Sequence, residues 1–385
     1  MENKVYGFYI PSLNLMGRGA IQEVGDRLKG VGAKKTLLVT DEGLKQLGIA
    51  DEIASIVKKA GLDVVVFPGA EPNPTDKNVK AGLEVYHNEQ CDSIVSLGGG
   101  SSHDCAKGIG IVASNGGTIH DYEGVDKSEK PLPPLVSINT TAGTASEMTR
   151  FCVITDTKRK VKMAIVDKHT TPLISINDPN LMIGMPKGLT AATGMDALTH
   201  AVEAYVSTDA TPLTDACAIK AIELISQYLR RAVANGQDIE ARENMAYAQF
   251  LAGMAFNNAS LGYVHAIAHQ FGGVYNLPHG VCNAILLPHV CRYNLIAKVD
   301  RFVDIAWALG ENVAGVPNRE AAELAIEAIE LLAYDVGIPE NFTELGVEKV
   351  DVELLANHAM KDATMLTNPR KATIEDVKAI IEAAL

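Results

Sequence analysis

The sequence predicts an α/β domain with a parallel sheet over residues 1–187, followed by an all-helical domain over residues 188–385. Three observations predict this division. In the first half, short apolar runs alternate with helical patterns, which is typical of a doubly wound α/β domain. In the second half, Ala, Leu, Ile and Glu recur at intervals of three and four residues, which indicates helices. A chain of 385 residues also exceeds one ordinary domain, so two hydrophobic cores are expected.

The expected strands of the first half are short apolar runs that end at Asp, Gly, Pro or Thr. Continuous apolar runs, without alternation, are typical of parallel strands that are buried on both faces. The segment 5–10, Val-Tyr-Gly-Phe-Tyr-Ile, is expected to form the first strand. The later expected strands are 36–40, 64–67, 93–97, 135–139, 151–154, 163–166 and 173–177.

Helical spacing separates these runs and then dominates the chain after Met185-Pro186. Within the first half, the expected helices are 43–60, 78–88 and 102–113. In the second half, the long expected helices are 190–206, 214–234, 241–256, 320–334 and 374–384.

Composition narrows the class of protein and its partners. The 34 Lys+Arg against 47 Asp+Glu leave a net charge of -13, which repels nucleic acid. No stretch approaches 18 uninterrupted apolar residues, so no membrane partner is expected. The N-terminus lacks the features of a signal peptide, and the six cysteines form no C-x-x-C, which together predict a cytoplasmic protein with reduced thiols. Chain length and the apolar start predict a homo-oligomer.

A glycine-rich loop lies between the expected strand 93–97 and the helix that follows it. Its residues are Gly98, Gly99, Gly100 and Ser101. Glycines let the backbone approach a ligand, while the exposed N–H groups and the helix dipole favour a phosphate. A tight turn without a ligand is the alternative. Three consecutive glycines followed by serine favour the phosphate.

Two further features point to a nucleotide. The loop that begins at Thr140-Thr141 and includes Thr144 carries hydroxyls suited to phosphate or ribose oxygens, although a capping box from Thr144 to Glu147 is an alternative. Asp41 ends another expected strand. A carboxylate there can accept both ribose hydroxyls and repel a 2′-phosphate, which favours NAD over NADP. Aspartate is also a common helix N-cap.

Histidines and one aspartate of the second half form pairs at helical spacing. Asp196 and His200 are separated by four residues, as are His265 and His269, so each pair shares one helical face. His279 follows in Pro-His-Gly, where we expect a turn that swings its imidazole towards the preceding helix. One carboxylate and three imidazoles on facing elements indicate a divalent-metal site with an open position. Buried structural histidines are the alternative, but an unpaired imidazole cluster is costly to bury.

Together these motifs resemble the iron-dependent alcohol dehydrogenases, the group III family. The resemblance extends over essentially the whole chain, and within the family it is strongest to the NAD-dependent methanol and 1,3-propanediol dehydrogenases. The motifs that carry it include Gly98-Gly-Gly-Ser-Ser-His-Asp, Thr140-Thr-Ala-Gly-Thr, Gly194-Met-Asp-Ala-Leu-Thr-His, His265-x-x-x-His269 and Pro-His279-Gly.

The resemblance implies a Rossmann-like dinucleotide-binding first domain and a metal-binding catalytic second domain. It makes Asp196, His200, His265 and His279 the ligands of a divalent metal, usually Fe(II), with Zn(II) or another ion as alternatives. His269 matches an additional histidine near the nicotinamide. The positions that match NAD contacts are Asp41, Asn73, Gly98, Gly99, Gly100, Ser101, Thr140, Thr141, Thr144, Lys162 and Leu181.

Four residues have weaker, divided or purely structural assignments. Phe256 matches an aromatic residue near the substrate pocket, although a core phenylalanine is an equal alternative. Phe151 stands where some relatives carry Asn near the cofactor, so its role stays open. His103, at the start of an expected helix, is a candidate contact to cofactor or substrate. His289 is expected to be structural.

The implied reaction is the reversible oxidation of a small primary alcohol or diol to the aldehyde by hydride transfer to NAD⁺. The metal lowers the pKa of the alcohol, the nicotinamide accepts the hydride, and the proton passes through His269, the cofactor ribose or water. One rival is a lyase like dehydroquinate synthase, which would need a strongly basic pocket, whereas residues 190–280 offer few Lys or Arg near the expected ligands. The second rival is a non-catalytic protein whose histidines only pack.

Overall fold

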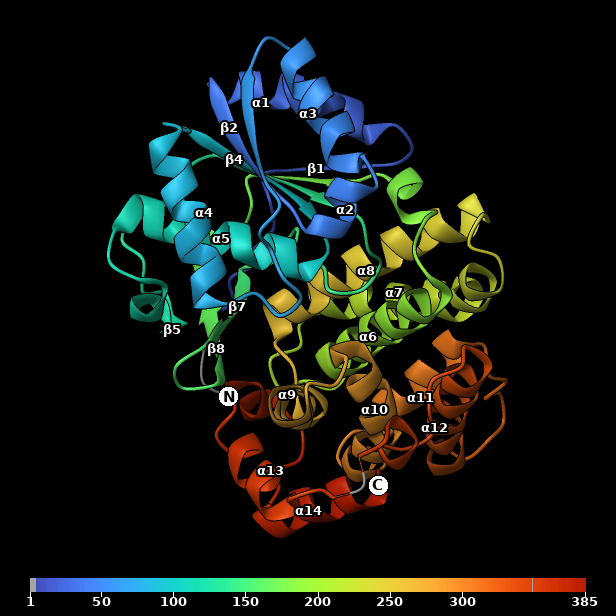
Figure 1. Cartoon of the computed structure of the whole chain (residues 1–385). Coiled ribbons are helices and arrows are strands. Elements are labelled where there is room, and N and C mark those ends of the chain that lie inside the picture. The colour runs from blue at the N-terminus through green and yellow to red at the C-terminus, as the bar shows by residue number, and fades with distance from the viewer. Residues whose placement is uncertain (1–4, 348) are drawn as a thin grey trace. The chain divides into compact units, whose positions relative to one another are not determined.

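The chain folds into two compact units, which we describe from a computed structural model for residues 5–347 and 349–385. Unit 1 comprises the described residues up to Thr141 together with Ala145–Met182, and unit 2 comprises Ala142–Thr144 and Ile183–Leu385. The predicted fold class is confirmed, because unit 1 is an α/β domain with a parallel sheet and unit 2 is helical (Figure 1). The expected boundary at 187 lies a few residues after Met182.

A six-stranded parallel sheet forms the centre of unit 1, in the order β1-β9-β6-β4-β2-β3. Because every neighbouring pair is parallel, the carboxyl ends of all six strands lie at the same edge. All residues of β4, β6 and β9 are buried, which explains their continuous apolar sequences. The strands are β1 (Leu13–Met16), β2 (Lys35–Val39), β3 (Asp63–Phe67), β4 (Ser93–Gly98), β6 (Leu135–Asn139) and β9 (Ile174–Asn177).

The first strand is not where the sequence predicted it. Residues 5–10 are described but belong to no helix or strand, and β1 begins at Leu13, where it pairs with Ile174 of β9. Val5 is 95% exposed, so this segment lacks the neighbouring strand that a sheet requires. The aromatic and β-branched residues of the segment signal β-propensity, which tertiary context overrides.

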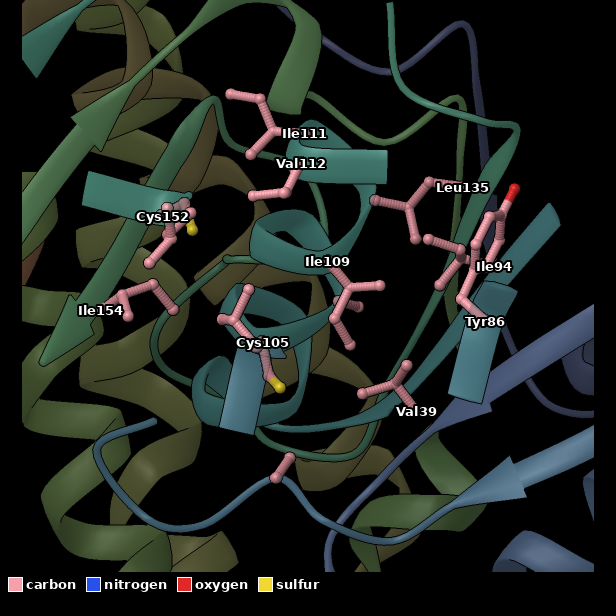
Figure 2. Close-up of a cluster of buried hydrophobic side chains, with 14 of the residues drawn as sticks. Val39, Tyr86, Ile94, Cys105, Ile109, Ile111, Val112, Leu135, Cys152 and Ile154 are labelled. Atoms are coloured by element: carbon pink, nitrogen blue, oxygen red, sulfur yellow. The ribbon is translucent and has the colours of Figure 1, made fainter. Parts of the chain in front are cut away.

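Helices cover both faces of the sheet. On one face, α1 (Val24–Gly30) and α3 (Ile49–Lys59) pack over Leu38, and on the other, α4 (Asp76–Asn88) and α5 (Gly100–Asn115) pack over Leu37. Adjacent strand residues point to opposite faces, so these two leucines belong to separate cores. Figure 2 shows the second core, in which Ile109 of α5 lies among side chains that include those of Ile94 and Leu135.

A smaller sheet completes the core around α5. Its strands are β5 (Gly124–Val125), β8 (Val161–Val166) and β7 (Phe151–Asp156), in that order, and β7 runs antiparallel to β8. Cys152 and Ile154 of β7 are buried against the same cluster as Ile109 (Figure 2). The basic residues from Lys158 to Lys160 form the turn between β7 and β8.

The single helix expected at 43–60 is two helices. The first is α2 (Glu42–Gln46), and α3 begins only at Ile49. Gly48 separates them with a φ of 79°, a left-handed conformation that glycine adopts without steric cost. The apolar periodicity continues across this break, so periodicity alone could not reveal it.

Among the described residues, unit 2 contains helices and no strands. The five helices expected there correspond to α6 (Lys187–Val206), α7 (Pro212–Ala234), α8 (Ile239–Ala259), α12 (Asn318–Asp335) and α14 (Ile374–Ala383). A further helix, α9 (Tyr263–Tyr275), carries the helical face expected for His265 and His269. Three more were not expected: α10 (His279–Leu295), α11 (Val299–Leu309) and α13 (Val352–Ala359). Pro288 lies inside α10, where proline is unusual in a helix.

The structure also describes the cysteines and the length and apolar character of the helices. All six cysteines are free, and five of them are buried. Among the described residues, we find no helix that combines the length and the apolar character needed to cross a membrane.

Candidate functional site

A carboxylate and three imidazoles converge in unit 2. Asp196 and His200 lie one turn apart on α6, His265 lies in the first turn of α9, and His279 is the first residue of α10 rather than part of an isolated turn. Asp196, His265 and His279 each offer one ligand atom, and these atoms lie within 4.8 Å of one another. His200 Nε2 lies 4.0 Å from Asp196 Oδ1. The four predicted metal ligands are therefore close together.

The ring of His200 is held between two other rings. It stacks on Phe256 with 4.2 Å between ring centroids, and on His265 with 4.7 Å. Phe256 is 4% exposed, so it forms a buried wall of the cluster. The core alternative for Phe256 accounts for this position, and its contact with substrate stays a prediction.

Burial and charge set the protonation of the cluster. Burial raises the pKa of Asp196, but the imidazoles of His200, His279 and His265 oppose it, and the pKa ends below its usual value. Burial, followed by the neighbouring His200, lowers the pKa of His265 well below its usual value. An ionised carboxylate and an unprotonated imidazole are the forms that bind a metal ion.

The donor atoms fit a divalent cation. Asn283, one turn after His279 on α10, places Nδ2 2.6 Å from Asp196 Oδ1 and 3.1 Å from Nε2 of both His265 and His279. Three atoms that can carry lone pairs thus converge on one amide nitrogen, which has only two hydrogens to donate. A cation satisfies several such atoms at once, and one carboxylate with three imidazoles suits Fe²⁺ or Zn²⁺.

His269 lies one turn after His265 and belongs to a second pair. Its Nδ1 is 2.8 Å from Asp362 Oδ2, and its ring stacks on that of His279. Burial raises the pKa of Asp362, but His269 and hydrogen bonds from Thr364 outweigh it and bring the pKa to about 2. The ionised carboxylate accepts a hydrogen bond from Nδ1, which leaves Nε2 of the 24% exposed His269 side chain for other contacts.

In unit 1, most of the expected cofactor residues follow the carboxyl ends of neighbouring parallel strands. Gly98 of β4 pairs with Asn139 of β6, which pairs with Asn177 of β9. In open α/β sheets, ligands bind at this edge. The residues that follow these ends and the end of β2 are Asp41, Gly99, Gly100, Ser101, Thr140, Thr141 and Leu181, of which Leu181 packs against the core.

The glycine-rich loop after β4 and the loop after β6 lie in close contact. Gly98 has a φ of 145°, and a Cβ at Gly99 would lie 3.0 Å from Thr141 Cγ2. Asn139 holds the second loop, because its Oδ1 accepts from the Thr141 N–H at 3.0 Å and its Nδ2 donates to the Thr141 carbonyl at 2.7 Å. The positive φ of Gly98 therefore favours glycine, and a side chain at position 99 would have to displace Thr141 slightly.

Three more predicted cofactor residues have distinct surroundings. Asp41 is the N-cap of α2, with Oδ1 accepting from the Leu44 N–H at 2.9 Å, so the capping alternative is confirmed and its ribose contact stays a prediction. Lys162 Nζ donates to Asn73 Oδ1 at 2.9 Å, which brings two predicted NAD contacts together. Their contact with NAD also stays a prediction.

Two expectations change, one for Thr144 and one for His103. No helix begins at Thr144 among the described residues; Ser146, Glu147 and Met148 form a turn, so the capping-box alternative is wrong. Thr144 itself belongs to the short segment Ala142–Thr144 of unit 2. His103 is fully buried, with Nδ1 2.8 Å from Ser96 Oγ, which favours a structural role over a cofactor contact.

A buried lysine connects α5 to the chain that follows the second loop. Lys107 Nζ donates to Ser146 Oγ at 3.1 Å and to the carbonyls of Thr149 and Phe151 at 2.9 and 2.7 Å. Asp104, one turn earlier, accepts from Ser146 Oγ at 2.6 Å. Lys107 therefore fixes the helix that begins at the glycine-rich loop.

Two protein-family models match the two halves of the chain. A family model described as iron-containing alcohol dehydrogenase matches residues 11–179, and the C-terminal model of the Fe-containing alcohol dehydrogenase family matches residues 190–385. The chain belongs to the iron-containing alcohol dehydrogenase family. The predicted resemblance is thereby confirmed.

Relatives of this iron-containing alcohol dehydrogenase match nearly all of its length. The NAD-dependent methanol dehydrogenase of Bacillus methanolicus is 56% identical over 378 residues, which cover 98% of this chain and 99% of the relative. The 1,3-propanediol dehydrogenase of Citrobacter freundii is 56% identical over 386 residues, with 100% of both chains covered. The structure is similar to that of a 1,3-propanediol oxidoreductase, with a TM-score of 0.98 at 54% identity over 99% of this chain and 100% of the other.

Family membership decides between the functional alternatives. An iron-containing alcohol dehydrogenase is an oxidoreductase that acts on an alcohol with a bound metal ion, so neither the lyase nor the non-catalytic protein is retained. Four residues that were not predicted from the sequence form hydrogen bonds with predicted site residues: Asn139, Glu203, Asn283 and Asp362. Of these, Glu203 and Asn283 carried a signal in the sequence, because each stands at helical spacing from a predicted ligand.

Proposed function

We propose that this iron-containing alcohol dehydrogenase catalyses the reversible oxidation of a small primary alcohol or diol to the aldehyde, with NAD⁺ as the hydride acceptor. The observation that carries the proposal is the convergence of Asp196, His265 and His279 in unit 2, with His200 beside them. The relatives named as NAD-dependent methanol dehydrogenase and 1,3-propanediol dehydrogenase support the substrate class and the cofactor.

In this proposal, Asp196, His200, His265 and His279 hold the metal ion, with iron as the family's metal. When bound, the ion supplies Lewis-acid stabilisation of the negative charge that develops on the alcohol oxygen. The side chains of Asp196, His200 and His265 are buried, so their positions would orient that ion. The residues at the carboxyl edge of the sheet orient the NAD⁺ that accepts the hydride, and backbone N–H groups after Gly99 bind its phosphates.

Product formation and substrate range test this proposal together. NADH formation is measured for alcohols from methanol to butanol and for 1,3-propanediol, with metal content determined on the same preparation. We expect net, stoichiometric NADH with at least one primary alcohol, in proportion to the bound metal. The absence of net NADH with all of these alcohols in metal-loaded protein would contradict the proposal.

His269 is the proposed catalytic residue, which moves a proton at Nε2 while Asp362 holds Nδ1. Asp362→Asn is expected to lower kcat about 10- to 100-fold, at or below the low end of what acid–base catalysis contributes, because an amide can present its NH₂ group to Nδ1 and reverse the tautomer. Metal content is expected to stay unchanged. Steady-state kinetics and metal analysis measure both quantities.

The matched control for this prediction is Asp351→Asn. Both aspartates cap a helix, since Asp351 accepts from the Leu354 N–H and Asp362 from the Thr364 N–H, but only Asp362 contacts a histidine. An equal fall in kcat in both variants would assign the effect to capping and remove Asp362 from the proposed catalytic pair.

Cofactor choice is proposed to depend on the negative charge of Asp41. Asp41→Gly is expected to shift the ratio of kcat/KM for NAD⁺ and NADP⁺ towards NADP⁺ by at least roughly tenfold, because the 2′-phosphate no longer meets a like charge. Asp41→Asn is expected to shift it in the same direction while keeping an oxygen that can cap α2. Unchanged preference in both variants would place Asp41 outside the ribose site.

Two further parts of the proposal concern the oligomeric state of the protein and its location in the cell. We propose a homo-oligomer, supported by the exposed apolar residues Val5, Tyr6 and Ile10 at the start of the described chain. We also propose a cytoplasmic location, supported by six cysteines without disulfides. Light scattering on the purified protein measures the number of subunits, and a monomer at micromolar concentration would contradict the first of these proposals.

A further inference from the structure

A buried glutamate stands directly behind one of the proposed metal ligands. Glu203 lies on α6, one turn after His200, and its side chain is 3% exposed. Its Oε2 is 2.6 Å from His265 Nδ1, and its Oε1 accepts from the Val264 N–H at 2.7 Å. Both carboxylate oxygens of Glu203 therefore contact the first turn of α9.

We propose that Glu203 is a positioning residue that fixes the ring orientation and the tautomer of His265 for metal binding. The inference rests on the proposed metal centre. When Glu203 is ionised, its carboxylate can only accept a hydrogen bond, so Nδ1 of His265 then carries the proton and Nε2 carries a lone pair. Nε2 is the atom of His265 that lies 3.1 Å from Asn283 Nδ2, on the side of the other proposed ligands.

Burial raises the pKa of Glu203 to about 7, and hydrogen bonds from backbone N–H groups at the start of α9 oppose this rise. Burying a charged group is costly unless it is hydrogen-bonded, and here the donors are the His265 ring and the Val264 backbone at the start of α9. Gly262, the N-cap of α9, gives this carboxylate room, because a Cβ at that position would lie 2.9 Å from Glu203 Oε1. One side chain of α6 thereby fixes both the start of α9 and the histidine within its first turn.

The alternative role for Glu203 is only to cap α9. The two roles differ in what Glu203→Gln does, because an amide offers one acceptor where the carboxylate offers two. Either the Val264 N–H or the His265 Nδ1–H then faces an NH₂ group. If Glu203 acts through His265, metal affinity falls; if it only caps the helix, stability falls and metal affinity does not.

The test measures the dissociation constant of Co²⁺ by competition with a chelator, on full-length protein freed of metal. Mutation of a carboxylate that is hydrogen-bonded to a metal-binding histidine typically weakens metal binding about 10- to 100-fold. We expect a weakening of this size in Glu203→Gln. The absorption spectrum of the bound cobalt is expected to change as well. Glu203→Asp, whose shorter side chain cannot reach both partners, is expected to weaken binding similarly and serves if the glutamine variant does not fold.

A double-mutant cycle separates positioning from general damage. In the background of His265→Ala, Glu203→Gln is expected to change cobalt affinity by less than about twofold, because the partner through which it acts is gone. Asp238→Asn is the matched control: this aspartate also caps a helix of unit 2, through the Ala241 N–H, and is not among the proposed ligands or their partners. It is expected to leave cobalt affinity unchanged.

The outcomes distinguish this inference from the proposed function. Wild-type protein that binds no cobalt would overturn the metal centre itself. Tight wild-type binding that stays unchanged in a folded Glu203 variant would overturn the positioning role and leave the metal centre standing. Losses that are equally large with and without His265 would also overturn it, because they would show that Glu203 does not act through this histidine.

Discussion

Asp196→Ala is expected to lower the rate of alcohol oxidation roughly a thousand-fold or more, while NAD affinity stays within a few-fold of wild type. Asp196 is the anionic member of the proposed ligand set and lies against three imidazoles, so its removal leaves the metal ion without a negative partner. Loss of the metal removes several kcal/mol of charge stabilisation in the transition state, which corresponds to this change in rate. His265→Ala is expected to have the same effect.

Three measurements on each variant check this prediction: kcat with the preferred alcohol, bound metal, and the dissociation constant of NAD. His289→Ala is the control, because this histidine lies on α10 and is expected to be structural. The control is expected to retain metal and activity. Near-normal activity in either ligand variant would show that the ligand assignment is wrong.

Lys107→Met is expected to destabilise unit 1 by about 3–5 kcal/mol, because three hydrogen-bond acceptors lose their buried donor, at about 1–3 kcal/mol for each acceptor left unsatisfied. The ammonium group is fully buried and donates to two backbone carbonyls and the Ser146 hydroxyl, and the carboxylate of Asp104 lies within the same network. Methionine fills a similar volume but donates no hydrogen bond. NAD affinity is expected to fall with stability, because α5 begins at the glycine-rich loop.

Thermal unfolding followed by circular dichroism measures this effect, which corresponds to a fall in the midpoint of roughly 10 °C. Lys220→Met is the control, since Lys220 is exposed and forms only a surface ion pair with Glu223. Its midpoint is expected to stay close to that of wild type. A Lys107→Met midpoint equal to that of Lys220→Met would contradict the structural role of the buried lysine.

Local patterns predicted those parts of the molecule that depend on short stretches of sequence. Continuous apolar runs located β4 and β6 because these strands are buried on both faces. The spacing of Asp196 and His200 placed both on one helical face for the same local reason. Residues 5–10 were assigned wrongly because a strand depends on a neighbour, which β-propensity does not report.

The missed residues of the site depend on contacts between distant parts of the chain. Glu203 and His265 are 62 residues apart in sequence, and His269 and Asp362 are 93 apart. Their pairing follows from how α6, α9 and the chain after α13 pack together, which no local periodicity encodes. A carboxylate at helical spacing from a metal-binding histidine is nevertheless a usable signal, because such histidines commonly donate their second N–H to a carboxylate.

The central claim is that Asp196, His200, His265 and His279 bind one metal ion. X-ray absorption spectroscopy of zinc-loaded protein tests it most directly, because scattering from imidazole rings identifies histidine ligands. The account predicts three imidazole nitrogens at about 2.0–2.1 Å and carboxylate oxygen at about 2.0–2.2 Å. A spectrum without imidazole scattering, at one bound zinc per chain, would contradict it.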